Sequence, residues 1–139
     1  MKRNQLTTHL FLDEYIPKEL YLKYEKNSYL LIGLIDRNLV KADQLLRSRF
    51  GMVTINNWWN GGDRQWSGLR TIESDYFSPT SQHTFGRASD KLFKTVTSLE
   101  VLNYISVNYK TLGINCIESN VAWVHSDVRC YCDNLLLVV

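Results

Sequence analysis

The chain of 139 residues has the length of one ordinary domain, enough to bury a hydrophobic core without disulfides or a structural metal. Hydrophobic residues make up 45% of it and charged residues 22%, which is typical of a globular protein and excludes a disordered one. A formal net charge of +2 is too small to indicate a nucleic-acid partner, although it is compatible with an anionic polymer. We therefore expect a single domain over residues 1–139.

The first third of the chain is predicted to be mainly helical. Residues 6–24 mix apolar and charged side chains and are interrupted by Pro17, which indicates a short extended piece followed by a short helix. From Leu31 to Phe50 the apolar residues recur every three or four positions, so the spacing predicts one amphipathic helix that ends at Gly51. Residues 52–56 contain β-branched side chains and alternate between apolar and polar ones, which predicts a strand.

Residues 57–66 have a different composition. Three tryptophans, Trp58, Trp59 and Trp66, surround a Gly-Gly pair, and the glycines predict a loop. Two interpretations of the indoles stay open: they form a wall of a substrate cleft, or the loop folds back and they cover the core. Arg70 follows at the expected end of a short strand, and residues 71–79 are expected to form a polar loop.

The second half of the chain alternates strands with one helix. Thr97 and Glu100 form a capping box, so a helix is expected to run to about Lys110 and to end near Gly113. Its apolar face would consist of Leu99, Val101, Leu102, Ile105 and Tyr109.

Residues 114–118 and 121–128 are expected to form paired strands around a turn at residues 119–120, and residues 135–139 a last strand packed in the core. This order predicts an α+β fold, an antiparallel sheet with flanking helices.

The cysteines and the first residues of the chain indicate the cellular compartment in which the protein is made. Three cysteines, Cys116, Cys130 and Cys132, are an odd number, which disfavours a disulfide framework and favours synthesis in a reducing cytoplasm. We interpret them as buried or edge-strand thiols rather than as half of a metal site. No apolar run of signal-peptide length follows the basic start, and no stretch approaches the roughly 18 apolar residues of a membrane span.

Two runs carry side chains suited to chemistry. Residues 81–90 read Ser-Gln-His-Thr-Phe-Gly-Arg-Ala-Ser-Asp, and residues 123–129 read Trp-Val-His-Ser-Asp-Val-Arg. A catalytic zinc site takes three nitrogen or oxygen ligands from the protein and leaves one tetrahedral position open, and His83, Asp90 and His125 supply such a set. Because His83 and Asp90 are seven residues apart, we expect a loop with His83 to lead into a strand with Asp90, beside a strand with His125.

The alternation of a strand places Trp123, His125 and Asp127 on one face of the sheet. His125 would then lie between an aromatic side chain and a carboxylate. Asp127 is placed to accept a hydrogen bond from a ligand histidine and so to fix its tautomer, or to act on the water that is attacked at the metal.

The pattern Ser-x-His-x-x-Gly-x-Ala-x-Asp over residues 81–90, followed by Trp-Val-His-x-Asp over residues 123–127, resembles peptidase family M15. This family contains zinc D,D-carboxypeptidases and L-alanyl-D-glutamate endopeptidases of cell-wall metabolism, and its metal-site fold is shared with the Hedgehog signalling domain. The similar region spans residues 58–129 and includes Ser67-Gly68-Leu69-Arg70, which is similar to the family's Ser-Gly-x-Arg segment.

The resemblance implies a Hedgehog-like fold and a Zn²⁺ cofactor held by His83, Asp90 and His125. It also implies that Arg70 binds a substrate carboxylate, a task suited to a planar two-pronged donor; the alternative is a surface arginine in a salt bridge. Ser81 and Trp123 are the further candidates for substrate binding.

The sequence departs from the family at the general base. Many members carry an acidic residue three positions before the last histidine, where this chain has Ala122. The remaining candidates for the catalytic carboxylate are Asp127 and Glu118, which a turn at residues 119–120 would bring beside the site. Glu118 is preferred, because the strand face of His125 already commits Asp127 to a neighbouring position.

The resemblance implies a hydrolase, a zinc metallopeptidase that cleaves cross-bridges or stem peptides of bacterial peptidoglycan. A small chain without an export signal or wall-binding module is similar to bacteriophage endolysins and virion-associated enzymes. Such a protein is made in the bacterial cytoplasm and acts at the cell wall or is carried in a virion. Its partners would be peptidoglycan peptides and other virion proteins, with no nucleic acid and no membrane. The alternative is a non-catalytic structural or binding module, such as a virion component, that keeps the fold and the zinc.

Overall fold

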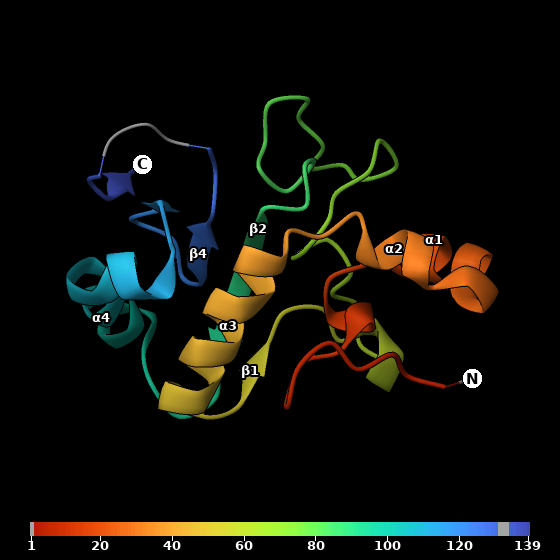
Figure 1. Cartoon of the computed structure of the whole chain (residues 1–139), viewed down its shortest axis with the longest axis horizontal. Helices are drawn as coiled ribbons and strands as arrows, with labels where there is room; N and C mark the ends of the chain where they lie inside the picture. The colour runs from red at the N-terminus through yellow and green to blue at the C-terminus, as the bar shows by residue number, and fades with distance from the viewer. Residues whose placement is uncertain (1, 131–133) are drawn as a thin grey trace.

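The computed structural model describes residues 2–130 and 134–139, and it shows helices packed against a sheet (Figure 1). The helices are α1 (Lys18–Tyr24), α2 (Tyr29–Ile32), α3 (Arg37–Phe50) and α4 (Ser98–Leu112), with short 3-10 turns at Leu12–Glu14, Glu25–Asn27 and Trp58–Asn60. The strands are β1 (Val53–Thr54), β2 (Ala88–Phe93), β3 (Cys116–Ile117), β4 (Val124–Asp127) and β5 (Leu137–Val138). The α+β class is thus as predicted.

The five strands form one sheet in the order β1-β2-β4-β3-β5. The β1–β2, β2–β4 and β3–β4 pairs are antiparallel, but β5 lies parallel to β3, so the prediction of an antiparallel sheet is wrong at this edge. The tail is an edge strand and not a core strand, since Leu135 and Val138 are 68% and 55% exposed. Its amides are satisfied by the free edge of β3: Val139 N–H donates to the carbonyl of Ile117 at 3.0 Å.

The single helix predicted from Leu31 to Phe50 is interrupted. α2 ends at Ile32 and α3 begins at Arg37, because Asp36 leaves the helical conformation and its carboxylate accepts a hydrogen bond from the amide of Asn38 at 2.8 Å. The amide of Asp36 in turn donates to the carbonyl of Gly86 at 2.9 Å. The break therefore docks the loop that precedes β2. The predicted end at Gly51 is correct.

Helix α4 follows the prediction closely. The capping box of Thr97 and Glu100 is present, and Gly113 ends the helix in the left-handed conformation with φ 74°. Val101 and Ile105 of the predicted apolar face are buried, whereas Leu99 is 66% exposed and does not belong to that face. Leu99 lies in the first turn, two residues before Val101, and positions two apart do not share one face of a helix.

The strand β2 separates two environments because its side chains alternate. On one side, Asp43 of α3 contacts Ser89 and Lys91. On the other side, the long connection between β1 and β2 brings Arg70 and His83 to the side chain of Asp90. Helix α3 thus covers the face of β2 opposite to Asp90, as Figure 1 shows for α3 lying across β2.

The core consists of two clusters of buried apolar side chains. One joins the N-terminal segment, the first turn of α3 and the loops, through Leu10, Leu12, Tyr15, Ile16, Tyr21, Leu31, Ile35, Leu39, Val40, Ile55, Trp58, Leu69 and Val128. The other joins α3, α4 and the sheet, through Ala42, Leu46, Val101, Ile105, Leu112, Ile114, Ile117 and Val124. No helix among the described residues has the length and apolar character that crossing a membrane requires.

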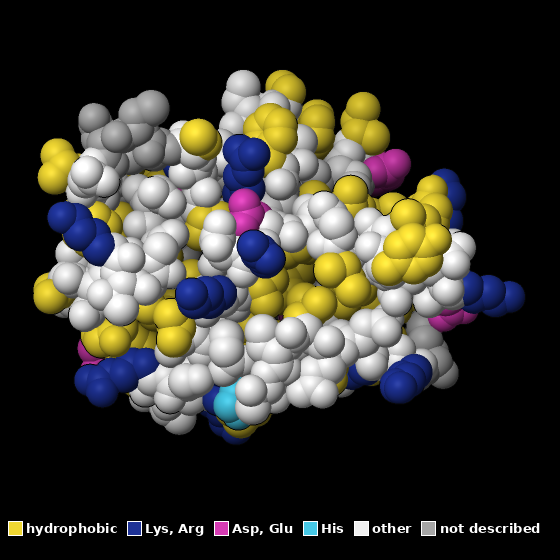
Figure 2. All heavy atoms as spheres, in the orientation of Figure 1, with side chains coloured by type: hydrophobic (Ala, Val, Ile, Leu, Met, Phe, Trp, Pro, Cys, Tyr) yellow, Lys and Arg dark blue, Asp and Glu magenta, His cyan; other side chains and the backbone are white. Residues whose placement is uncertain are grey.

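An apolar hollow of about 350 Å³ lies between the N-terminal segment, α2 and α3, on the face shown in Figure 2. Its floor includes Leu6, Ile35 and Val40, and Arg37 and Lys41 are among the residues that line it. None of the predicted site residues lines this hollow.

Candidate metal centre

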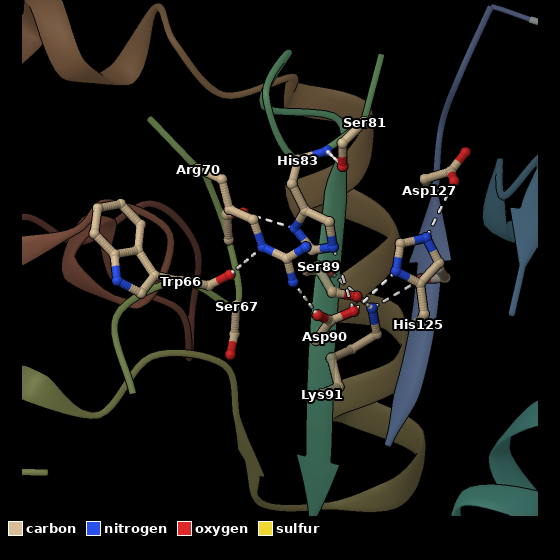
Figure 3. A network of polar contacts seen from close by, with 12 residues as sticks. Trp66, Ser67, Arg70, Ser81, His83, Ser89, Asp90, Lys91, His125 and Asp127 are labelled. Carbon is tan, nitrogen blue, oxygen red and sulfur yellow. Dashed lines mark hydrogen bonds and ion pairs between the residues drawn. The ribbon is translucent and has the colours of Figure 1, made fainter. Parts of the chain in front are cut away.

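Three side chains from three segments converge on one point (Figure 3). His83 comes from the loop before β2, Asp90 from β2 and His125 from β4, as expected from the spacing. Asp90 and His125 are direct partners in the register of the antiparallel pair. Oδ1 of Asp90 lies 2.8 Å from Nδ1 of His125 and 3.4 Å from Nε2 of His83. All three residues are buried.

The ring of His83 is oriented by the backbone of the Ser-Gly-x-Arg segment. Its Nδ1 lies 2.8 Å from the carbonyl oxygen of Gly68, which can only accept, so Nδ1 donates this hydrogen bond and Nε2 is directed at Asp90. Gly68 rests on the backbone of Tyr15, where a Cβ atom would come within 2.4 Å of the Tyr15 carbonyl oxygen. Glycine is therefore required at this position by close packing.

The carboxylate of Asp90 uses its two oxygens differently. Oδ1 faces the two imidazoles, while Oδ2 accepts a hydrogen bond from Nη2 of Arg70 at 2.7 Å. Burial raises the pKa of Asp90, but hydrogen bonds from His125 and His83 outweigh it and hold this pKa well below its usual range. The carboxylate is thus ionised and has one oxygen directed at the site.

Arg70 was predicted to lie at the end of a strand and to bind substrate, and it lies instead in a loop. Its Nε donates to the carbonyl of Trp66 at 2.8 Å and its Nη2 to Asp90. Arg70 thus forms a salt bridge, but a part-buried one with a candidate metal ligand and not the surface salt bridge of the alternative. The side chain still lines the cleft described below, so the predicted contact with a substrate carboxylate stays a prediction.

His125 lies between two carboxylates. Its Nε2 is 3.2 Å from Oδ2 of Asp127, as expected from their shared strand face. Burial lowers the pKa of His125, but hydrogen bonds to Asp127 and Asp90 outweigh it and raise this pKa above its ordinary value. Asp127 is in turn held by Arg129 at 2.7 Å; burial raises its pKa, and hydrogen bonds from Arg129 and His125 lower it to about 2.

The three side chains could hold a metal ion. Their ligand atoms lie within 4.8 Å of one another, and no other such group of histidine, cysteine or acidic side chains occurs in residues 2–130 and 134–139. Zinc–ligand bonds of about 2.0–2.2 Å in a tetrahedral site separate neighbouring ligand atoms by roughly 3.3–3.6 Å. The separation of 3.4 Å between Asp90 and His83 lies in this range, whereas the 2.8 Å between Asp90 and His125 is a hydrogen-bond distance. Two nitrogens and one oxygen are also the donor set of catalytic zinc sites.

The site opens into a cleft of about 560 Å³. Arg70, Ser81, Glu118 and Trp123 line it together with the three candidate ligands, so these four predicted residues are brought together at the site. Asp127 does not line the cleft and reaches it only through His125. The cleft also contains Asp63, Arg64, Gln65, Trp66, Ser67 and Tyr76.

Of the three tryptophans, two cover the core and one lines the cleft, so each of the two interpretations holds for part of this segment. Trp58 is buried and donates from Nε1 to the carbonyl of Ile16 at 2.9 Å, and its ring lies 5.7 Å from that of Trp59. These two indoles cover the core. Trp66, beyond the Gly-Gly pair, lines the cleft.

Tyr76 was missed by the sequence analysis because it lies in a segment considered only a polar loop. It is 69% exposed and lines the cleft, and the guanidinium of Arg70 lies 5.8 Å from the centre of its ring. An exposed aromatic between two motif segments was the signal that could have found it.

The cysteines play no part in the site as far as the structure describes them. Cys116 is buried on β3 and Cys130 is exposed, as free thiols. Cys132, and with it the Cys-x-Cys pair, lies outside the described residues.

Comparisons of the chain with protein-family models, with curated proteins and with solved structures return no match.

Proposed function

We propose that the protein is a zinc metallopeptidase that cleaves peptides of bacterial peptidoglycan, as an endolysin or virion-associated enzyme of bacteriophage type. The observation that carries the proposal is the convergence of His83, Asp90 and His125 in the lining of a cleft. The resemblance of residues 58–129 to peptidase family M15 supplies the reaction and the substrate class. A zinc ion, when bound, would supply the Lewis acid that polarises the scissile carbonyl and acidifies the attacking water.

Glu118 is the carboxylate we assign as general base. It follows β3 directly and lines the cleft, whereas Asp127 does not line the cleft and is bonded to His125 and Arg129. A general base must lie where it can take a proton from the nucleophile and deliver it to the leaving amine. Of the two candidates, Glu118 is the one that lines the cleft, and this favours it for the role.

The shape of the surface is consistent with a peptide substrate that extends beyond the bond to be cleaved. A second hollow of about 370 Å³ shares Gln65 and Trp66 with the cleft. Lys23 and Glu73 are among the residues that line it. Trp66 and Trp123 offer flat apolar surfaces in the cleft, against which a peptide backbone can pack.

The proposal is tested by incubating the purified protein with peptidoglycan, with and without a chelator, and identifying the released fragments by mass spectrometry. Glu118→Gln should keep the zinc and the fold and lose roughly a hundredfold or more in rate. Asp63→Asn is the matched control, because Asp63 is another carboxylate of the same cleft, and it should retain most of the activity. Equal losses in both variants would remove Glu118 from its role.

The alternative, a module that keeps the metal and has no catalytic activity, is favoured by one observation. Ala122 stands where family relatives carry an acid; it is exposed, and its carbonyl accepts a hydrogen bond from Ser98. Full zinc occupancy of the wild-type protein with no release of fragments from any wall preparation would establish this alternative.

A further inference from the structure

A fully buried ion pair lies directly behind the candidate metal centre. Lys91 of β2 and Asp43 of α3 are both 0% exposed, and Nζ of Lys91 is 3.0 Å from Oδ1 of Asp43. Oδ2 of Asp43 accepts hydrogen bonds from the hydroxyls of Ser89 at 2.7 Å and Tyr15 at 3.0 Å. Removing two charges from water is costly, so this arrangement calls for an explanation.

The ammonium group of Lys91 links two strands. It donates to the carbonyl and hydroxyl oxygens of Ser89 on its own strand, at 3.0 and 2.7 Å, and to the hydroxyl of Ser126 on β4 at 2.8 Å. Ser89 and Ser126 are partners in the strand register, and the next pair along is Asp90 and His125. The link thus lies one residue from the pair that supplies two of the three candidate ligands, on the opposite face of the sheet, where Figure 3 shows Lys91 beneath Asp90.

We infer that Lys91, with Asp43 and Ser126, is a positioning residue that fixes the register of β2 against β4 and thereby holds Asp90 and His125 in the geometry that binds the metal. The inference rests on the proposed metal site, and it concerns the metal-free protein as much as the loaded one.

The hydrophobic pattern alone does not fix this register. A slip of one residue would turn Val124 out of the core and is opposed by burial. A slip of two residues keeps every side chain on its face, yet it would move His125 away from Asp90 by roughly 7 Å. That slip would also carry the hydroxyl of Ser126 out of reach of Lys91, leaving the buried ammonium short of a partner. The hydrogen bond from Lys91 to Ser126 therefore opposes a slip that hydrophobic patterning permits.

The test uses Lys91→Met, which keeps the length of the side chain and removes its charge, and Ser126→Ala, which removes only the cross-strand partner. Asp13→Asn is the matched control, since Asp13 is 1% exposed and forms a 2.8 Å ion pair with Arg3, which does not line the cleft. For each purified variant, zinc affinity is measured by competition with a chromophoric chelator, the site is observed by the absorption spectrum of the cobalt form, and stability is measured by urea unfolding. Cross-strand nuclear Overhauser contacts between β2 and β4 are recorded without metal.

We expect Ser126→Ala and Lys91→Met to bind zinc about tenfold or more weakly, the scale for groups that orient metal ligands, with an altered cobalt spectrum and weakened β2–β4 contacts. Asp13→Asn should lose stability and keep the zinc affinity of the wild type. Wild-type zinc affinity in folded Ser126→Ala and Lys91→Met would overturn the inference while leaving the proposed function in place. If the wild type itself binds no zinc, the proposed function and the metal role fall together. Unchanged β2–β4 contacts in the variants would overturn the register role in either case.

Discussion

Gly86 gives the sharpest prediction about how the site is assembled. It lies between His83 and β2 with φ 66°, and a Cβ atom built there would come within 1.8 Å of the carbonyl oxygen of Leu34. Gly113 at the end of α4 has a similar φ of 74°, but its Cβ would meet nothing within 4 Å. Alanine at either position pays the cost of the left-handed conformation, about 1–2 kcal/mol. Only Gly86→Ala must also displace a neighbouring backbone segment.

The extra cost at Gly86 can be worked out from the contacts. An ordinary contact requires the Leu34 carbonyl to move by more than about 1.5 Å, and overpacking of this kind costs about 1–3 kcal/mol. The movement also breaks the hydrogen bond from the Asp36 amide to the Gly86 carbonyl, worth about 1 kcal/mol. Gly86→Ala should therefore lose about 2–4 kcal/mol more free energy of unfolding than Gly113→Ala.

Urea unfolding of both variants, followed by circular dichroism, measures this difference directly. The zinc affinity of Gly86→Ala should fall as well, because the displaced loop carries His83, while that of Gly113→Ala should not change. Equal losses of stability in the two variants would show that the approach of Gly86 to Leu34 has no energetic weight and would refute the reasoning.

Three further predictions concern single side chains. Asp127→Asn should weaken zinc binding about 10–100-fold, since Asp127 orients His125; a larger loss in turnover than in affinity would instead make Asp127 the base. Arg70→Lys should weaken zinc binding, because lysine cannot hold Asp90 and the Trp66 carbonyl together, and it should raise KM if Arg70 also binds a substrate carboxylate; unchanged values of both would remove Arg70 from the site. The pKa of Glu14 is raised by burial from 4.5 to about 7, so the folded protein binds this proton more tightly than the unfolded chain, and the associated stability is complete below pH 4.5 and is lost as the pH rises through 7. Glu14→Gln should thus gain stability relative to the wild type between pH 4.5 and 8, by up to about 3 kcal/mol, and a pH-independent difference in urea unfolding would contradict this.

The place of His83 in a loop before the strand of Asp90, and the shared strand face of His125 and Asp127, could be predicted from the sequence because local rules fix them. The spacing from His83 to Asp90 requires a loop and then a strand, and the alternation along residues 123–127 requires His125 and Asp127 to share a face. The capping box at Thr97 is likewise a local signal and was read correctly. Each of these inferences depends on residues within one segment.

The parts that could not be predicted depend on contacts between distant segments. The break before α3 requires the Gly86 carbonyl, which is fifty residues away along the chain, as partner for the Asp36 amide. The engagement of Arg70 with Asp90 depends on how the long loop folds back on β2. The parallel pairing of β5 with β3 depends on which sheet edge is free, and no periodicity in residues 135–139 encodes that choice.

The residues that position His83 limit how far the protein can be truncated. His83 is held by Gly68, Gly68 packs on the backbone of Tyr15, and the hydroxyl of Tyr15 binds Asp43, which holds β2 from behind. Tyr15 and Asp43 both precede the span of residues 58–129 that resembles the peptidase family. A fragment restricted to that span would contain all three candidate ligands. It would lack Tyr15 and Asp43, which position the segments that carry His83 and Asp90. The shortest fragment that keeps this candidate metal site in its folded geometry should therefore begin ahead of Tyr15.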